Sequence, residues 1–257
     1  MNIIVITGAS SGIGLEFALQ MDSYFSNIDE FWLVARSRDK MEELAGVLHH
    51  RTRIFAMDIA KEGQIARLED MLREKKAVVR ILVNCAGYGL MGPFVKQDPE
   101  GELGMIRLNC EALTAMTHSL IPYMRKGSRI IQLASSAAFL PQPDFAVYAA
   151  TKSYVLSFSR ALGEELKQQK IYVTSVCPGP VDTSFFDIAE RTGTTLKIKK
   201  YTMVSPERVV AQALRDSYHK RPLSVCSLPI QSFRAACKFC PHGLILDVMG
   251  ILKKLHF

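Results

Sequence analysis

Short apolar runs alternate along the chain with segments in which apolar residues recur at helical spacing. The runs predict strands over residues 3–8, 31–36, 53–58, 80–87, 128–135, 171–179 and 223–228, and the first helical segment runs from about Gly12 to Ser23. Continuous Val, Ile and Leu runs are typical of strands buried on both faces of a parallel sheet. The pattern therefore predicts an α/β fold, a doubly wound parallel sheet of about seven strands with helices on both faces.

No linker, repeat or low-complexity tract interrupts this pattern before residue 228. We therefore expect residues 1–257 to form a single domain, a length that is ample for a sizeable core. No positively charged stretch precedes a removable apolar segment, which predicts no secretory signal. The six cysteines are irregularly spaced, which favours free thiols and a cytoplasmic location.

The chain carries a net charge of +7 and has a pI near 9.1. This excess suits an anionic cofactor or an acidic partner, but the basic residues are spread along the chain and do not indicate nucleic-acid binding. The cysteines of CKFC (237–240) and His242 lack a second Cys/His pair. We expect no metal site, because structural zinc normally needs four ligands.

The segment TGASSGIG follows the first predicted strand and opens the first predicted helix. It contains Gly8, Gly12 and Gly14, with Ser10, Ser11 and Ile13 between them. Glycines allow a tight turn and let backbone N–H groups approach a pyrophosphate, whose charge the helix N-terminus favours. The spacing differs from G-x-G-x-x-G, but its place between a strand and a helix predicts a phosphate-binding loop.

The segment YAATK (148–152) places Tyr148 and Lys152 one helical turn apart on the same face. An ammonium near a phenol favours the phenolate and lowers the tyrosine pKa, which would suit proton transfer. Taken alone, the pair would be mostly structural, because the same spacing occurs by chance on many amphipathic helices.

Together these motifs resemble the short-chain dehydrogenase/reductase family over about residues 1–228. The resemblance implies a Rossmann-type sheet that binds NAD(P) across the carboxyl ends of its strands. It also implies a catalytic group of Ser135, thirteen residues before Tyr148, together with Tyr148, Lys152 and Asn109. In this scheme Tyr148 donates a proton to the carbonyl oxygen that Ser135 holds. Lys152 tunes the phenol and binds the nicotinamide ribose, and Asn109 holds a water that links Lys152 to solvent.

The same resemblance implies a set of cofactor-binding residues in the loops that follow the strands. Asp58 would meet the adenine, Asn84 begins a motif in which Cys85 replaces a second asparagine, and Thr183 would bond the nicotinamide carboxamide or a phosphate. The full set is Gly8, Ser10, Ser11, Gly12, Ile13, Gly14, Arg36, Asp58, Ile59, Asn84, Ala86, Gly87, Tyr148, Lys152, Pro178, Gly179, Val181 and Thr183.

The end of the second predicted strand bears on the choice of nicotinamide cofactor. NAD enzymes carry an acidic residue there, whereas a nearby arginine accommodates the 2′-phosphate of NADP. Here Ala35 occupies the acidic position, and Arg36 follows with Ser37 and Arg38. The sequence therefore predicts a preference for NADP(H) over NAD(H), although Ser11 stands where a basic residue in the loop would give a second signal.

Apolar residues predict the substrate class. The resemblance implies a lid over residues 184–203, with Phe185, Phe186, Ile188 and Leu196, and further wall positions at Tyr88, Leu90, Met91, Phe94, Phe139 and Phe145. Such a lining favours a lipophilic ketone, such as a 3-oxoacyl compound or a steroid.

We therefore expect an NADPH-dependent carbonyl reductase or alcohol dehydrogenase with a small-molecule substrate, and the resemblance implies a homodimer or homotetramer. A non-catalytic NADP-binding regulatory or scaffold protein of the same fold is the alternative. A sugar-nucleotide epimerase is disfavoured, because the chain lacks the G-x-x-G-x-x-G loop and the longer C-terminal domain of those enzymes.

Residues 229–257 diverge from the family pattern. The stretch HGLILDVMGIL is apolar but interrupted by Asp247, too short to span a bilayer, and followed by Lys253 and Lys254. We expect this tail to pack on its own domain or against a neighbouring subunit, and peripheral contact with a membrane surface is the alternative.

Overall fold

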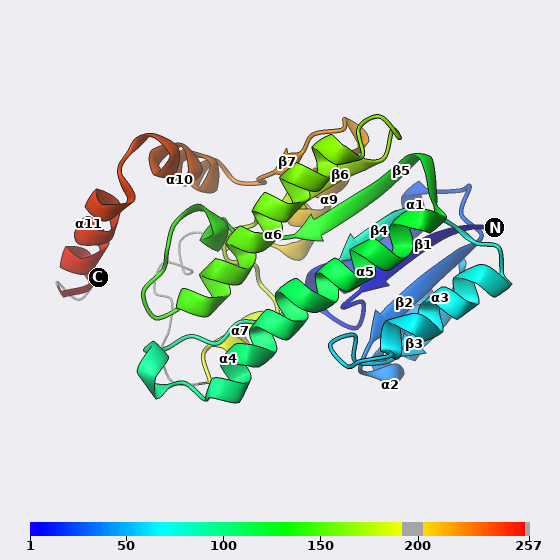
Figure 1. Cartoon of the computed structure of the whole chain (residues 1–257), viewed down its shortest axis with the longest axis horizontal. Helices are drawn as coiled ribbons and strands as arrows, with labels where there is room; N and C mark the ends of the chain where they lie inside the picture. The colour runs from blue at the N-terminus through cyan, green and yellow to red at the C-terminus, as the bar shows by residue number, and fades with distance from the viewer. Residues whose placement is uncertain (192–202, 255–257) are drawn as a thin grey trace.

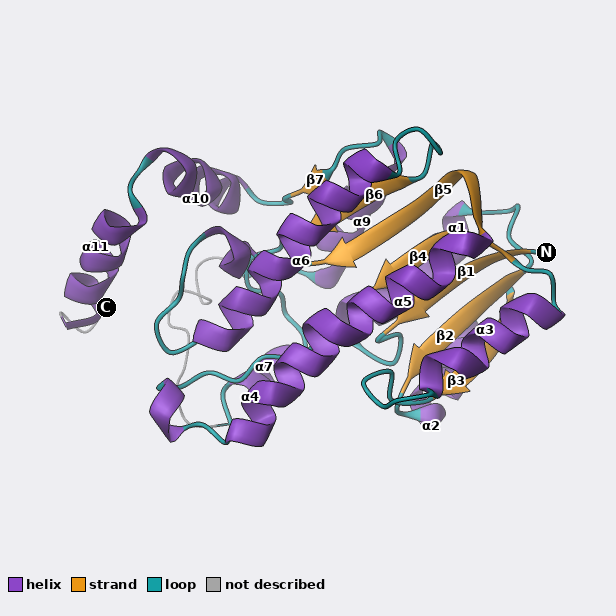
Figure 2. Ribbon diagram, viewed as in Figure 1, coloured by secondary structure: helices purple, strands orange, loops and turns teal. Residues whose placement is uncertain are grey.

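A computed structural model of the protein describes residues 1–191 and 203–254. Its strands form one seven-stranded parallel sheet in the order β3-β2-β1-β4-β5-β6-β7 (Figures 1 and 2). The strands are β1 (Asn2–Thr7), β2 (Glu30–Ala35), β3 (Arg51–Ala56), β4 (Val78–Asn84), β5 (Met124–Leu133), β6 (Tyr172–Val176) and β7 (Leu223–Ser224). The predicted doubly wound parallel sheet is confirmed.

Helices cover both faces of the sheet (Figure 1). One face is covered by α3 (Gln64–Glu74), α5 (Leu113–Leu120) and α6 (Ala146–Glu165). The other is covered by α1 (Gly12–Tyr24), α2 (Arg38–Val47) and α9 (Pro206–Tyr218). The sheet is therefore buried on both sides, which is why its strands read as continuous apolar runs.

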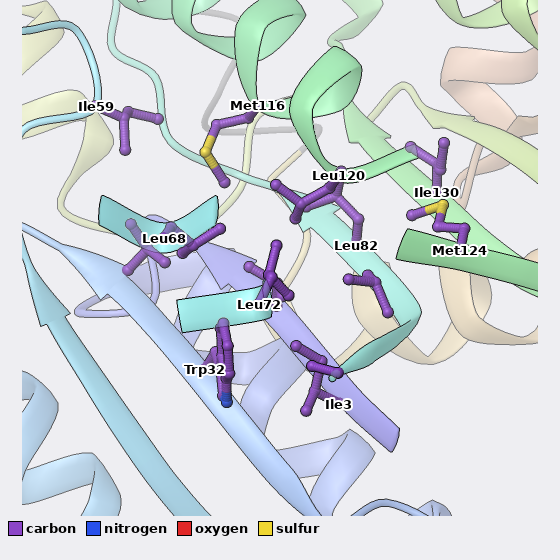
Figure 3. Packing of buried hydrophobic residues seen from close by; sticks show 14 of the residues in the cluster. Ile3, Trp32, Ile59, Leu68, Leu72, Leu82, Met116, Leu120, Met124 and Ile130 are labelled. Atoms are coloured by element: carbon purple, nitrogen blue, oxygen red, sulfur yellow. The ribbon is translucent and has the colours of Figure 1, made fainter. Parts of the chain in front are cut away.

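Strand β1 shows how a continuous apolar run serves two cores. Ile3 and Val5 point to one face, where strand residues pack with Leu72 of α3 and Met116 of α5 (Figure 3). The alternate side chains Ile4 and Ile6 point to the opposite face and pack with α1 and α2. Successive strand side chains point to opposite sides, so residues 3–7 of β1 are buried on both faces of the sheet.

The predicted strands extend too far at their carboxyl ends. The sixth was expected over 171–179 and the seventh over 223–228, whereas β6 ends at Val176 and β7 at Ser224. Cys177 and Val225 are apolar because they belong to a buried cluster beyond the sheet, not because they lie in a strand. The residues that follow these strands are buried apolar loop residues, and a pattern of hydrophobic positions cannot distinguish them from strand residues.

A segment of π-helix separates two α-helical segments that follow β4. Helix α4 (Pro99–Ile106) begins at the cap Asp98, continues into η2 (Arg107–Ala112) and then into α5. The extra residue per turn in a π-segment changes the direction of its side chains, and such segments are frequent at functional sites. Asn109 lies in this π-segment and is buried.

The remaining elements lie at the amino end of β5 (η3), near the carboxyl edge or in the tail. They are η1 (Phe94–Lys96), η3 (Ile121–Tyr123), η4 (Ser136–Phe139), α7 (Phe185–Ala189), α10 (Leu228–Phe239) and α11 (His242–Lys254). Helix α10 follows β7 beside η4, and α11 projects from the body of the protein with the C-terminus (Figure 1). Within the described ranges, every helix is too short or too polar to cross a membrane.

Asp22 joins the end of α1 to the start of β3. Its carboxylate accepts the backbone N–H groups of His49 and His50 at 2.9 and 3.0 Å, and both Nδ1 atoms lie 2.7 Å from it. Burial alone would raise the pKa of Asp22, but these hydrogen bonds outweigh burial and hold it well below its usual range. The carboxylate therefore fixes the connection that precedes β3.

We predict that Asp22→Ala lowers the free energy of unfolding by about 3 kcal/mol, because it leaves the part-buried backbone N–H groups of His49 and His50 without their acceptor. The matched control is Asp70→Ala, which removes an exposed ion pair with Arg73 and should cost at most about 0.5 kcal/mol. Urea denaturation measures both values. Equal losses in the two variants would contradict the role assigned to Asp22.

Candidate functional site

A cavity of about 860 Å³ lies at the carboxyl edge of the sheet. Its wall includes residues from the loops that follow β1, β2, β3, β4, β5 and β6. The chain passes from β1 toward β2 in one direction and from β4 toward β5 in the other. Parallel sheets leave a crevice at such a switch point, so the topology itself positions the cavity.

The glycine loop forms one wall of the cavity. Gly8 has φ of +69°, a conformation that disfavours other residues. A Cβ on Gly14 would lie 2.2 Å from the Gly8 carbonyl oxygen, so this turn closes only with glycine. In the described chain the Ser11 side chain makes no capping bond to α1, which leaves the first-turn N–H groups available to an anion. All six predicted loop residues line the cavity.

The end of β2 and the start of α2 supply two of the basic groups of the cavity. Arg36 and Ser37 line it as predicted. Arg38 does not: its guanidinium lies 3.3 Å from Glu42 one turn along α2 and is exposed. Lys40 lines the cavity instead. The sequence analysis missed Lys40, although its spacing of four from Arg36 at the start of a helix was a usable signal.

Ser135 and Tyr148 meet on the opposite side of the cavity. Ser135 follows β5 and caps η4, where its Oγ accepts the Ala137 N–H at 3.2 Å. Tyr148 lies in the first turn of α6, and only 7% of its surface is exposed. Its ring stacks on Phe145 at 4.2 Å between centroids and contacts Phe185 at 5.5 Å. These aromatic neighbours fix the phenol at the cavity wall.

Lys152 lies one turn after Tyr148 on α6 and is also buried. Its Nζ donates to the Leu133 carbonyl oxygen at 2.8 Å and lies 5.6 Å from the centroid of the Tyr148 ring. Both side chains line the cavity, so the structure brings the predicted pair and Ser135 together. The surface-helix interpretation of YAATK is excluded, because both polar side chains are buried.

The pKa of Tyr148 differs from the sequence expectation. In the protein alone, burial raises it to about 12, and a hydrogen bond with Ser135 only partly offsets the rise. Burial also lowers the pKa of Lys152 to about 8. The expected lowering of the tyrosine pKa by the ammonium is therefore not observed, because desolvation acts more strongly on the phenol.

Two of the predicted site residues do not line the cavity. Asn109 lies behind it, where its amide bonds the backbone N–H and carbonyl of Tyr88 and the Thr151 hydroxyl. A Cβ on Gly87 would lie 2.8 Å from the Asn109 Oδ1 and 3.5 Å from the Lys152 Nζ. Asn109 is therefore close to Lys152 across Gly87.

Asn84 is the second of these residues. Its Nδ2 donates to Thr117 and Gln132 at 3.0 Å each, and its side chain is buried. The amide thus links β4 to α5 and β5 through hydrogen bonds, and a direct contact between Asn84 and the cofactor stays a prediction.

The loops after β3 and β6 line the cavity as predicted, with Asp58, Ile59, Pro178, Gly179, Val181 and Thr183. Thr183 packs against the glycine loop, since a Cβ on Gly12 would lie 3.3 Å from the Thr183 methyl group. Asp58 lies beyond β3 and not in it, and its Oδ1 accepts the Ala60 N–H. Ala86 and Gly87 line the cavity from the loop after β4.

Aromatic and aliphatic side chains surround the remaining part of the cavity. Of the predicted wall positions, Tyr88, Met91, Phe145, Phe185, Phe186 and Ile188 line it. Phe94 instead is 63% exposed, and Phe139 packs in a buried cluster with Val155. Leu90 packs beside Met105 without lining the cavity, and Leu196 lies outside the described residues.

Helix α10 contributes wall residues that the sequence analysis missed. Pro229, Ile230 and Phe233 line the cavity. A Cβ on Gly179 would lie 2.8 Å from the Ile230 side chain, so the helix packs directly on the loop after β6. The helical spacing of Ile230, Phe233 and Cys237 was the available signal.

Comparison with known proteins places this site in a family context. The short chain dehydrogenase family model matches residues 2–192. An uncharacterized oxidoreductase of Staphylococcus epidermidis is 32% identical over 186 residues, covering 70% of this chain and 78% of that protein. The human very-long-chain 3-oxoacyl-CoA reductase is 29% identical over 223 residues, covering 82% of this chain and 67% of that protein.

A solved structure shares the fold over nearly the whole chain. It is a short-chain dehydrogenase from Sphingobium yanoikuyae in complex with NADPH, with a TM-score of 0.80 and 28% identity. The alignment covers 96% of each chain. The glycine loop, the basic residues after β2 and a cavity at the switch point are features that fit a dinucleotide of this kind.

We predict that Gly14→Ala weakens NADPH binding at least about tenfold, because the new methyl group would displace the Gly8 carbonyl and the loop. Gly46→Ala is the matched control, since a Cβ there meets nothing within 4 Å in α2. Titration of NADPH fluorescence measures both affinities, and circular dichroism checks folding. A folded Gly14→Ala variant with unchanged affinity would contradict the role of this loop.

Proposed function

Because the chain belongs to the short-chain dehydrogenase family, we propose that it reduces lipophilic ketones to alcohols with NADPH. Its relatives make it an NAD(P)-dependent oxidoreductase acting on CH–OH and C=O groups. The observation that carries the proposal is the position of Ser135, Tyr148 and Lys152 on the same cavity as the glycine loop. A cofactor in that loop and a carbonyl at Tyr148 would share one enclosed space.

In the proposed mechanism Tyr148 is the acid. NADPH, when bound, supplies a hydride to the carbonyl carbon. The phenol gives its proton to the carbonyl oxygen as negative charge develops there. A pKa raised to about 12 by burial keeps the phenol protonated near neutral pH, so the proton is present when it is needed.

Ser135 holds the carbonyl oxygen beside the phenol. Its Oγ accepts the Ala137 N–H and its side chain hydrogen-bonds to Tyr148 in the protein alone, and with substrate bound its O–H would donate to the carbonyl oxygen instead. A hydroxyl donor aimed at an oxygen that becomes negative stabilises the transition state more than the ground state. Ser135 therefore both orients the ketone and stabilises the developing charge.

Lys152 stabilises the phenolate that Tyr148 becomes after it has given up its proton. Its ammonium lies beside the ring and is held by the Leu133 carbonyl. Opposite charges attract strongly in a buried site. Asn109, which lies close to Lys152 across Gly87, is assigned to the relay that returns a proton to the pair.

The preference for NADPH is proposed from the residues at the end of β2. Ala35 leaves no carboxylate to bind a ribose 2′-OH, and Arg36 and Lys40 bring two positive charges to the cavity. Charge-assisted hydrogen bonds from such groups favour a 2′-phosphate. The NADPH complex of the Sphingobium relative supports this assignment.

The apolar wall supports a lipophilic substrate. Tyr88, Met91 and Phe145 line one part, and Phe185, Phe186 and Phe233 line another. Gln142, Asp187 and Arg191 also line the cavity, but the aromatic groups offer the larger surface, so binding affinity would come chiefly from apolar burial. Ketones with a long acyl chain or a steroid skeleton fit this chemistry, and the human relative named for 3-oxoacyl-CoA reduction makes such thioesters the first compounds to test.

We predict NADPH consumption with 3-oxoacyl thioesters and oxosteroids, and less with small ketones. Tyr148→Phe should lower turnover at least about a hundredfold, because it removes the acid, while NADPH affinity is retained. The control is Tyr154→Phe on the same helix as Tyr148, which alters an exposed phenol that is hydrogen-bonded to Thr114. Near-normal turnover of Tyr148→Phe would refute the mechanism, and no consumption by the wild type with any ketone would refute the function.

For the cofactor, we predict that Arg36→Ala weakens NADPH about tenfold or more while NADH affinity changes little, because only NADPH carries the 2′-phosphate. Arg38→Ala is the matched control, since Arg38 pairs with Glu42 away from the cavity. Dissociation constants for both cofactors measure the effect. Equal losses of NADPH and NADH in Arg36→Ala would refute the phosphate assignment.

A further inference from the structure

We propose that helices α10 and α11 dock the protein on the surface of a membrane that contains anionic lipid. The two helices follow the last strand, and α11 projects away from the sheet (Figure 1). The proposal concerns an interaction surface and does not depend on the reductase activity proposed above.

The outward faces of these helices carry large apolar side chains that the protein does not cover. Leu228 and Phe239 are 76% and 80% exposed at the two ends of α10. Leu244 and Val248 are 59% and 48% exposed, and their spacing of four puts them on one face of α11. Exposed apolar residues scattered singly are ordinary, whereas a group of them beside basic residues favours an interaction surface.

The charged residues of α10 and α11 indicate which kind of partner binds their exposed face. Helix α10 carries two exposed basic side chains, Arg234 and Lys238, and among the described side chains of the two helices Asp247 is the only acidic one. Basic side chains beside an exposed apolar face are the pattern of interfacial helices, which gain from both apolar insertion and attraction to anionic headgroups. A second copy fits less well, because a two-fold interface would bring the same basic residues together.

The length of the helices favours lying on the membrane over crossing it. Helix α11 runs from His242 to Lys254, about 20 Å at the α-helical rise. A hydrocarbon core is about 30 Å thick. Helix α10 is also anchored to the protein through Ile230 and Cys237, which are buried. Both helices therefore suit the plane of the interface.

Docking through this face would bring the cavity close to the lipid. Ile230 and Phe233 on the inner side of α10 line the cavity, while Phe239 on the same helix is exposed. One helix thus separates the apolar wall of the cavity from the proposed membrane surface. A lipophilic ketone is more concentrated in the bilayer than in water, so docking would bring the cavity close to the substrate class proposed above.

The test is co-sedimentation of the full chain with vesicles. We expect binding to vesicles of phosphatidylglycerol and phosphatidylcholine, weaker binding to phosphatidylcholine alone, and loss of the difference at high salt. Phe239→Ser and Lys238→Glu should each lower the partition coefficient about tenfold. Val47→Ser and Lys126→Glu, which alter exposed residues remote from the tail, should leave it unchanged.

Folding of the variants is checked with NADPH affinity without vesicles, which should equal that of the wild type. Leu244→Ser on α11 provides a second apolar variant if Phe239→Ser is unstable. Equal binding to both vesicle types, or losses in the remote variants as large as those in the tail variants, would overturn the proposal. So would a wild type that binds no vesicles but forms a dimer that Phe239→Ser dissociates, because the face would then belong to a second copy.

Discussion

Burial of two ionisable side chains one helical turn apart, Tyr148 and Lys152, governs the chemistry of the site. Desolvation raises the pKa of the phenol to about 12 and lowers that of the amine to about 8. Both shifts disfavour charge. The pair is thus a protonated phenol next to an ammonium group that loses its proton more readily than an exposed lysine. The neighbouring Ser135 and Leu133 orient both groups through hydrogen bonds.

The parallel sheet makes this burial compatible with access to the cavity. Strands buried on both faces deliver six loops to one edge, and the switch point between β1 and β4 leaves space between them. The glycine loop and the acid therefore reach one cavity from opposite sides, although about 130 residues separate them along the chain. Helix α10 closes the apolar end, and its outer face is free to meet a membrane.

Much of this arrangement could be predicted from local sequence. Apolar runs identify the strands, and TGASSGIG and YAATK identify the loop and the pair, because each motif carries its own geometry. The carboxyl ends of the strands could not be placed, since buried loop residues such as Cys177 are as apolar as the strands. The roles of Lys40 and Phe233, and the direction of the Tyr148 pKa shift, depend on residues distant in sequence that only folding brings together.

The central claim is that Lys152 must be charged while Tyr148 remains protonated, and a pH profile of ketone reduction tests it most directly. Since burial lowers the pKa of Lys152 to about 8, the ammonium is present below that pH and is lost above it. We predict that kcat/KM for the ketone is level between pH 6 and about 8 and falls at higher pH. A rate that rises through pH 8, or stays constant to about pH 10, would contradict the account.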